Sequence, residues 1–272
     1  MCNLDQVNSI PQTYSKLTND SVAEVKNPNG KFPLLLICEH ASNYIPPEFD
    51  NLGIDEETAT SHAAYDIGIR EVAVNLSNIL DAPLVVSNIS RLVIDCNREP
   101  YSPDSTPSQS EIYSIPKNAN ISPQEKSYRV KTYYQPFHDC IRNTMLSRTD
   151  LKVLLALHSF TPVFMGIDRE MEIGVLFEQD NQLSRIFLQS SSLFSNLITV
   201  ANEPYAPDPK VSHTIKKHAT PFNLPNLMLE IRNSLIRNEK SQWEIAEIIA
   251  KMIQHSMREF NKLNKQRNYS EE

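Results

Sequence analysis

The sequence predicts an α/β fold in which a mixed, mostly parallel sheet carries helices on both faces, giving three layers. Short runs that are apolar throughout, such as the run at 34–38, are typical of strands buried on both faces. Segments with helical periodicity alternate with these runs. Polar and ionisable residues directly follow several runs, which is where open α/β sheets bind their ligands.

Composition limits the kind of protein this is. Of the 272 residues, 40% are hydrophobic and 22% are charged, which is enough for a sizeable core. We expect a flexible polar leader over 1–30 and a single domain over 31–272. The net charge of -7 argues against a nucleic-acid binder. Because no signal peptide and no membrane-spanning run is recognisable, we expect a cytoplasmic protein without membrane contacts.

The positions of the glycines and cysteines argue against several further kinds of site. The five glycines are spaced so that no dinucleotide or phosphate loop can be formed. None of the four cysteines lies in a C-x-x-C pair, so neither a zinc ribbon nor a redox pair is indicated. We therefore expect buried free thiols.

The elements are expected in a regular order. A strand at about 33–39 precedes a loop, and a helix over 57–80 has its apolar residues at spacings of three and four. Pro136 should interrupt a later helix. A proline-rich loop at 99–123 is a candidate lid. The remaining predicted elements are strands at 84–89, 152–158, 172–177, 197–201 and 227–232, helices at 125–148, 180–192 and 241–262, and a loop at 202–225.

Two histidines, His40 and His158, stand at the ends of two predicted buried strands. Neutral imidazole is a common zinc ligand, and a catalytic zinc site has three protein ligands and an open position for water. The sequence therefore predicts that both histidines bind a metal. The alternative is that each is an ordinary histidine of the core or of a loop.

A second cluster, Arg91, Asp95, Asn97 and Arg98, follows the strand at 84–89. Its arginines and its asparagine could hold a substrate carboxylate, since one arginine can bind a carboxylate through two hydrogen bonds. Asp95 would orient an arginine or a metal-bound histidine. The alternative is a salt-bridge patch on the surface, although the apolar residues at 92–94 favour burial.

Two carboxylates complete the set of candidate site residues. Glu230 lies within the apolar run at 227–232, where a carboxylate next to a metal-bound water would be a suitable general base. The alternative interpretation of Glu230 is a buried ion pair with Arg232, which lies on the same face of the strand. Asp66 is either the N-cap of a helix or a carboxylate of the metal site. Of the other histidines, only His218, just before the Glu230 strand, is a further candidate for the site.

Five motifs occur in order over about 34–236 and together resemble the N-formylglutamate amidohydrolase family. That family is similar in fold to the zinc carboxypeptidases (a phosphorylase-like sheet) and to the aspartoacylase and succinylglutamate desuccinylase group. The motifs are Cys-Glu-His-Ala-Ser at 38–42, Ala-Tyr-Asp-Ile-Gly at 64–68, Ser-Arg-Leu-Val-Ile-Asp-Cys-Asn-Arg at 90–98, Leu-His-Ser-Phe-Thr-Pro at 157–162 and Leu-Glu-Ile-Arg-Asn at 229–233.

The resemblance implies one Zn²⁺ ion and hydrolysis of the amide bond of a small N-acyl amino acid. The simplest substrate would be N-formyl-L-glutamate, cleaved to formate and L-glutamate, as in histidine degradation. His40 and His158 would be zinc ligands, and Glu230 would activate the water. The residues expected to bind the substrate are Arg91, Asn97, Arg98, Ser159 and Arg232.

One position departs from the carboxypeptidase pattern. Where that pattern has a glutamate three residues after the first histidine, this chain has Asn43, a poor zinc ligand. The third ligand must then be Glu39 or Asp66. We take Asp66 as the ligand and place Glu39 with Asp95 behind the histidines. Two rival functions remain: a peptidase or deacylase for a larger N-acyl substrate, and a non-catalytic binding protein without zinc.

Overall fold

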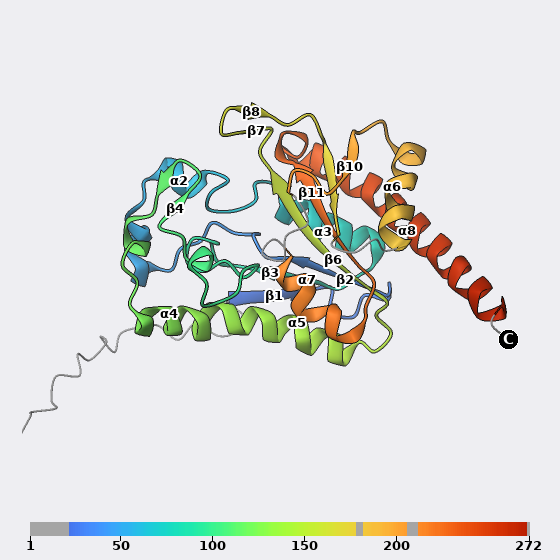
Figure 1. Cartoon of the computed structure of the whole chain (residues 1–272), viewed down its shortest axis with the longest axis horizontal. Helices are drawn as coiled ribbons and strands as arrows, with labels where there is room; N and C mark the ends of the chain where they lie inside the picture. The colour runs from blue at the N-terminus through green and yellow to red at the C-terminus, as the bar shows by residue number, and fades with distance from the viewer. Residues whose placement is uncertain (1–21, 178–181, 206–211, 271–272) are drawn as a thin grey trace, which may run out of the picture.

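A seven-stranded mixed sheet forms the centre of the structure, a computed structural model that describes residues 22–177, 182–205 and 212–270 (Figure 1). In spatial order its strands are β1 (Ala23–Lys26), β3 (Leu84–Ser87), β2 (Leu34–Cys38), β6 (Val153–Phe160), β11 (Asn226–Arg232), β9 (Ile173–Leu176) and β10 (Thr199–Ala201). The four strands from β3 to β11 run parallel, while β1 and the β9–β10 pair run antiparallel to their neighbours in that group. The predicted fold class is confirmed.

The central strands are apolar throughout because both faces of the sheet are covered. In β2, Leu34 and Leu36 enter the hydrophobic cluster on one face, while Leu35 and Ile37 enter the cluster on the other. Successive side chains of a strand point to opposite faces. Both sets are therefore apolar in a strand that lies between two hydrophobic cores.

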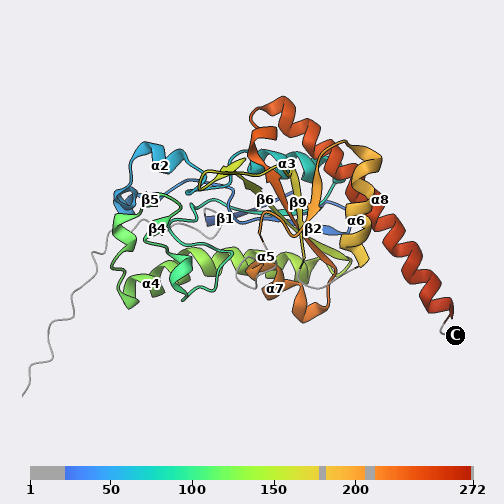
Figure 2. The ribbon, with the colours of Figure 1, turned by 45° about the horizontal axis from the view of Figure 1, so that its top comes forward.

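Helices cover both faces, as predicted (Figures 1 and 2). Val72 of α3 and Ile249 of α8 lie in the first cluster, and Phe137 of α5 lies in the second. One face carries α3 (Ile69–Leu80), α6 (Gln182–Phe194) and α8 (Glu239–Ser270), and the other carries α4 (Pro123–Arg129), α5 (Gln135–Ser147) and α7 (His213–His218). The end of α8 runs past the body of the molecule in Figure 1. No helix among the described residues has the length and apolarity needed to cross a bilayer.

Part of the predicted leader belongs to the sheet. The strand β1 pairs antiparallel with β3, with Ala23 opposite Ser87 and Lys26 opposite Leu84. Its sequence Ala-Glu-Val-Lys alternates apolar and polar residues, as suits an edge strand with one solvent-facing side, and is too short to stand out within a polar segment. The prediction of a flexible leader is therefore wrong for 23–26, and 1–21 lie outside the described residues.

The helix predicted over 57–80 is broken. Its first part is α2 (Glu56–Thr60), and α3 begins only at Ile69. Gly68 precedes α3 with a φ of 78°, and a Cβ at this position would collide with the carbonyl oxygen of Ile236. Because no side chain caps α3, the interpretation of Asp66 as its N-cap is wrong. The break leaves Asp66 beside β2, where its backbone N–H donates to the carbonyl oxygen of His40 at 3.0 Å.

The helix predicted over 125–148 is interrupted near Pro136, as expected. A π-helical turn, η4 (Val130–Tyr134), separates α4 from α5, and Pro136 is the second residue of α5. Proline cannot donate a hydrogen bond and crowds the preceding turn, and a wider turn accommodates both effects.

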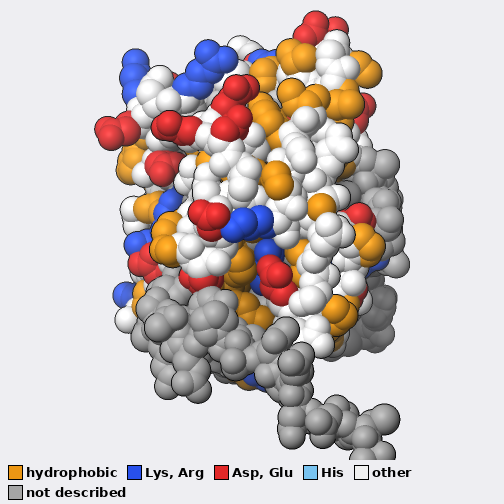
Figure 3. Space-filling view, turned by 90° about the vertical axis from the view of Figure 1, so that its left-hand side faces the viewer, with side chains coloured by type: hydrophobic (Ala, Val, Ile, Leu, Met, Phe, Trp, Pro, Cys, Tyr) orange, Lys and Arg blue, Asp and Glu red, His pale blue; other side chains and the backbone are white. Residues whose placement is uncertain are grey.

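Short elements fill the connections. The segment at 99–123 holds η2 (Pro103–Ser105), β4 (Gln109–Ser110), β5 (Tyr113–Ser114) and η3 (Pro116–Asn118), and elsewhere lie η1 (Pro47–Gly53), β7 (Val163–Phe164), β8 (Ile167–Asp168), η5 (Thr220–Phe222) and η6 (Asn233–Leu235). Figure 3 shows the end of the molecule that carries α2 and β4, where acidic, basic and hydrophobic side chains are interspersed.

The order of the strands creates a switch point between β2 and β6. The chain leaves β2 through α3 to reach β3 on one side, and leaves β3 through α4 and α5 to reach β6 on the other. These two connections lie on opposite faces of the sheet. Ligands of open α/β sheets bind beyond the carboxyl ends of the strands at such a point.

Candidate active site

Three adjacent strands bring ionisable side chains to this switch point. His40 follows β2, His158 lies near the end of β6, and Glu230 is the residue of β11 paired with His158. All three are buried and line a small cavity of about 80 Å³. Residues separated by nearly 200 positions in the sequence therefore meet because their strands are neighbours.

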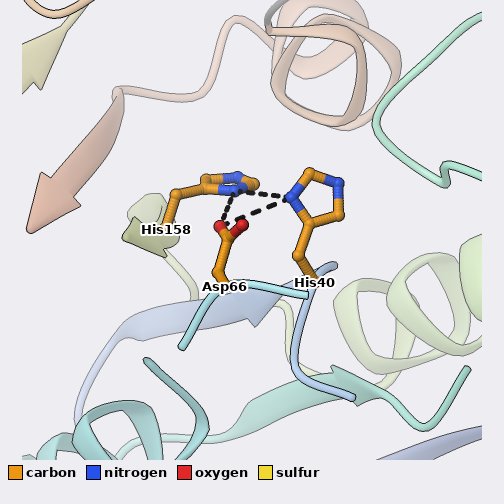
Figure 4. Close-up of side chains that lie close together, drawn as sticks. All are labelled: His40, Asp66 and His158. Carbon is orange, nitrogen blue, oxygen red and sulfur yellow. Dashed lines mark hydrogen bonds and ion pairs between the residues drawn. The ribbon is translucent and has the colours of Figure 1, made fainter. Parts of the chain in front are cut away.

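His40, Asp66 and His158 point toward one another (Figure 4). The Nδ1 atoms of the two histidines are 3.2 Å apart, and Asp66 Oδ2 lies 3.0 Å from that of His158 and 3.4 Å from that of His40. Each of the three residues is at most 3% exposed. The group could therefore hold a metal ion.

The three donor atoms fit one face of a tetrahedral zinc site. Nitrogen and oxygen ligands stand about 2.0–2.1 Å from zinc, which places the ligand atoms roughly 3.3–3.4 Å from one another. The observed separations of 3.0, 3.2 and 3.4 Å are close to this spacing. Two imidazoles and one carboxylate form a donor set of the kind found in catalytic zinc sites, which leave the fourth position open.

The outer nitrogens of both histidines face carboxylates. His40 Nε2 lies 2.8 Å from Asp95 Oδ1, and when it donates there, Nδ1 keeps its lone pair for a metal. His158 Nε2 lies 3.3 Å from Glu39 Oε2, close enough for an ion pair but without the geometry of a hydrogen bond. Glu39 thus lies behind the His158 ring, whereas Asp66 lies at the centre of the group.

Asp66 is fixed from several directions. Its Oδ2 accepts a hydrogen bond from the backbone N–H of Ser159 at 3.2 Å, and its Oδ1 accepts one from Arg91 at 3.3 Å. The Ser159 hydroxyl donates to the carbonyl oxygen of Ile67, so Ser159 ties the Asp66 segment to β6. Asn43 lies outside the group, since its amide donates to the Ala59 carbonyl.

The site places buried carboxylates directly beside imidazole rings. Burial opposes ionisation of Glu39, Asp66 and Asp95, but attraction to the neighbouring histidines outweighs it and lowers the pKa of each carboxyl. Burial likewise opposes protonation of His158, but Glu39 and Asp66 outweigh it and raise the pKa of this imidazole well above its usual value. Buried charge requires compensation, and a divalent cation between the histidines would supply the positive charge that an imidazolium proton otherwise provides.

Glu230 has the properties of a proton acceptor. Its side chain is 4% exposed, and its Oε2 has no hydrogen-bond partner among the described residues. Burial raises the pKa of the Glu230 carboxyl to about 7. The alternative pairing with Arg232 is wrong, because Arg232 instead donates to Glu172 at 2.8 Å and does not line the cavity.

Arg91, Asn97 and Arg98 of the second predicted cluster line the cavity, and Asp95 is buried next to Arg91, so the cluster is not a surface patch. Arg91 donates to Asp95 at 2.9 Å as well as to Asp66. The Oδ1 of Asn97 accepts the backbone N–H of Thr214 at 3.0 Å, so α7 fixes the orientation of this carboxamide.

Comparison with known proteins shows to which family the chain belongs. A family model described as "N-formylglutamate amidohydrolase" matches residues 32–237. The chain belongs to this family. A solved structure of a gene product from Agrobacterium tumefaciens is 39% identical, covers 89% of this chain and 97% of its own, and gives a TM-score of 0.85. No curated protein sequence matches the chain.

A second solved structure supports the fold. The N-formylglutamate amidohydrolase of Ralstonia eutropha JMP134 is 17% identical, covers 88% of this chain and 99% of its own, and gives a TM-score of 0.55. At this identity the similarity shows a shared architecture. Membership of the family supports an amidohydrolase function for this chain.

Two residues of this family member line the cavity without having been predicted. His62 follows α2 in the broken helix, with its Nδ1 3.8 Å from Asp66 Oδ1, and burial lowers its pKa to about 4. Tyr205 comes from the loop after β10. Gly174 of β9 allows the backbone of this loop to approach, since a Cβ there would collide with the Glu203 carbonyl oxygen. No local pattern in the sequence distinguishes either residue.

Two other predicted features lie outside the cavity. His218 is buried against His138, with His138 Nδ1 and His218 Nε2 2.8 Å apart, and is not part of the cavity wall. The candidate lid at 99–123 contributes no residue to that wall in the described part of the chain.

Proposed function

We propose that this protein is a zinc-dependent amidohydrolase that cleaves a small N-acyl amino acid, most simply N-formyl-L-glutamate to formate and L-glutamate. The observation that carries the proposal is the convergence of His40, Asp66 and His158 in one cavity with Glu230, whose Oε2 has no partner among the described residues. The family to which the chain belongs supports amide hydrolysis.

The proposed metal ligands are His40, Asp66 and His158. A zinc ion held by them would act as a Lewis acid that lowers the pKa of water and polarises the acyl oxygen. Asp95 and Glu39 would keep the two imidazoles in the tautomer and orientation that binding requires.

Glu230 acts as the general base. Its free carboxylate oxygen takes a proton from the attacking water, whose oxygen forms a bond to the acyl carbon. When the C–N bond breaks, Glu230 passes that proton to the leaving nitrogen. The products are a carboxylic acid and a free amine.

Arg98 and Asn97 position the substrate. Both line the cavity, and Thr214 fixes the Asn97 carboxamide through its Oδ1. A guanidinium group and an amide at this place suit the α-carboxylate of an amino acid. Arg91 already binds Asp66 and Asp95, so its part is to hold these carboxylates in place.

The test is a screen of zinc-loaded protein against N-formyl, N-acetyl and N-succinyl amino acids, in which the release of free amine is measured. Glu230→Gln should lower kcat by about 100- to 10,000-fold with unchanged zinc content. Glu247→Gln on the exposed face of α8 is the matched control and should be fully active. Activity only on peptides or longer N-acyl chains would favour the larger-substrate rival, and a protein that neither binds zinc nor releases amine would favour the binding-protein rival.

A further inference from the structure

Arg169 lies in a cage of three aromatic rings beside the cavity. It follows the β7–β8 hairpin, in the connection between β6 and β9. Its guanidinium carbon is 4.6 Å from the ring centroid of Phe164, 5.3 Å from that of Tyr205 and 5.7 Å from that of Phe160. Contacts of this kind orient a guanidinium group and leave its N–H edge available.

Among the described residues, no acidic side chain neutralises the charge of Arg169. Within 22–177, 182–205 and 212–270, it forms no ion pair with an acidic side chain, and its hydrogen bond is a long one of 3.5 Å to the Thr161 carbonyl. Arg91 and Arg232, by contrast, are each bound to carboxylates at 2.9 Å or less. Aromatic rings attract a cation but do not cancel its charge, so Arg169 retains the capacity to bind an anion.

The cage joins Arg169 to the catalytic cavity. Tyr205 lines the cavity, and Phe160 lies two residues beyond His158 on β6. The positive charge of Arg169 acts on both His62 and Tyr205, which are wall residues. Arg169 therefore lies in contact with a wall residue of the cavity, on the side that Tyr205 forms.

We propose that Arg169 is a specificity-determining residue, whose guanidinium group binds the side-chain carboxylate of a substrate such as N-formyl-L-glutamate. This inference rests on the proposed function. Arg98 and Asn97 hold the α-carboxylate from the segment after β3, and Arg169 recognises the second carboxylate from the segment after β6. The alternative is that Arg169 only clamps the hairpin against Tyr205.

A comparison of two substrates separates these roles. N-formyl-L-glutamate and N-formyl-L-glutamine have nearly the same shape and differ in charge. Arg169→Gln should lower kcat/KM for the glutamate compound by about 10- to 100-fold, the size expected for one charge-assisted contact, and change it less than threefold for the glutamine compound. Arg169→Lys, which keeps the charge over the rings, should restore part of the preference. Arg258→Gln, on an exposed position of α8, is the control.

Binding of the product provides a second readout that does not depend on turnover. The affinity for L-glutamate, measured by calorimetry, should fall in Arg169→Gln while the affinity for L-glutamine stays constant. Equal losses for both compounds would show a clamp, and no loss would show that Arg169 does not touch the ligand; either result overturns the proposal. A wild-type protein inactive on every N-acyl amino acid would instead refute the proposed function, while the calorimetric comparison would still decide the role of Arg169.

Discussion

Replacing Asp66 should abolish tight metal binding, whereas replacing Glu39 should only weaken it. The two carboxylates were the sequence-based candidates for the third ligand, and the structure places them differently. Asp66 Oδ2 is 3.0 and 3.4 Å from the two inner histidine nitrogens, while Glu39 Oε2 is 3.3 Å from the outer nitrogen of His158. Asp66 can therefore contact the same ion as both histidines, and Glu39 acts through the imidazole ring.

The expected magnitudes follow from these positions. Loss of a carboxylate behind a metal-binding histidine lowers metal affinity by about 10- to 100-fold, or about 1.4–2.7 kcal/mol. We expect this loss for Glu39→Gln. Asp66→Asn removes one of three ligands and places an amide, a poor zinc ligand, in the site, so its loss should exceed ~100-fold.

Zinc affinity should be measured by competition with a chromogenic chelator, together with the zinc content of the purified proteins. Asp95→Asn serves as a second control, since Asp95 contacts the outer nitrogen of His40 at 2.8 Å and should behave like Glu39. If Asp66→Asn binds zinc as tightly as Glu39→Gln does, or if Glu39→Gln is the variant without metal, the assignment of the third ligand is wrong.

Three further outcomes are expected. Burial lowers the pKa of His218 to about 4 and that of His138 well below its usual value. The free energy of unfolding, measured with urea, should therefore be fully present above pH ~6.5 and fall toward pH 4, with His218 contributing a loss on the order of 2 kcal/mol at pH 5. His138→Gln should make this pH dependence shallower. Gly68→Ala should cost more stability than Gly166→Ala in the same assay, because both have a φ of 78° but only Gly68 is packed against Ile236, and equal losses would contradict this account. Removal of zinc with a chelator should lower the thermal midpoint, since a ligand present at ~100 times its Kd contributes about 2.7 kcal/mol, and an unchanged midpoint would count against a buried metal.

The layered fold was predictable because its signals are local. A run such as 34–38 is apolar throughout only if both faces are covered, and this fixes its place in the middle of the sheet. The edge strand β1 was missed because four alternating residues in a polar segment carry too weak a pattern. The break between α2 and α3 was missed because apolar spacing continues through it, while the cause, contact of Gly68 with Ile236, joins positions far apart in the sequence.

Residues of the candidate site were easier to predict from the sequence when they lie at the end of an apolar strand. His40, His158 and Glu230 stand at or near the ends of apolar runs, so their meeting follows from the order of the strands. Asp66 remained one of two candidates because its place depends on the broken helix. Arg232 was misjudged because alternation gives the face of a strand but not the carboxylate that a long side chain reaches.

The candidate metal ligands and the residues proposed to bind substrate lie on different parts of the fold. His40 directly follows β2, His158 lies on β6, and the Asp66 segment is fixed to both by the backbone N–H groups of Asp66 and Ser159. The residues proposed to bind substrate, Arg98 and Arg169, come from connections after β3 and β6. Strands packed between two cores tolerate few substitutions, whereas the connecting segments can change in sequence with a small loss of stability. Changes in the segment between β6 and β9 should therefore alter which N-acyl amino acid this protein cleaves without altering its metal affinity.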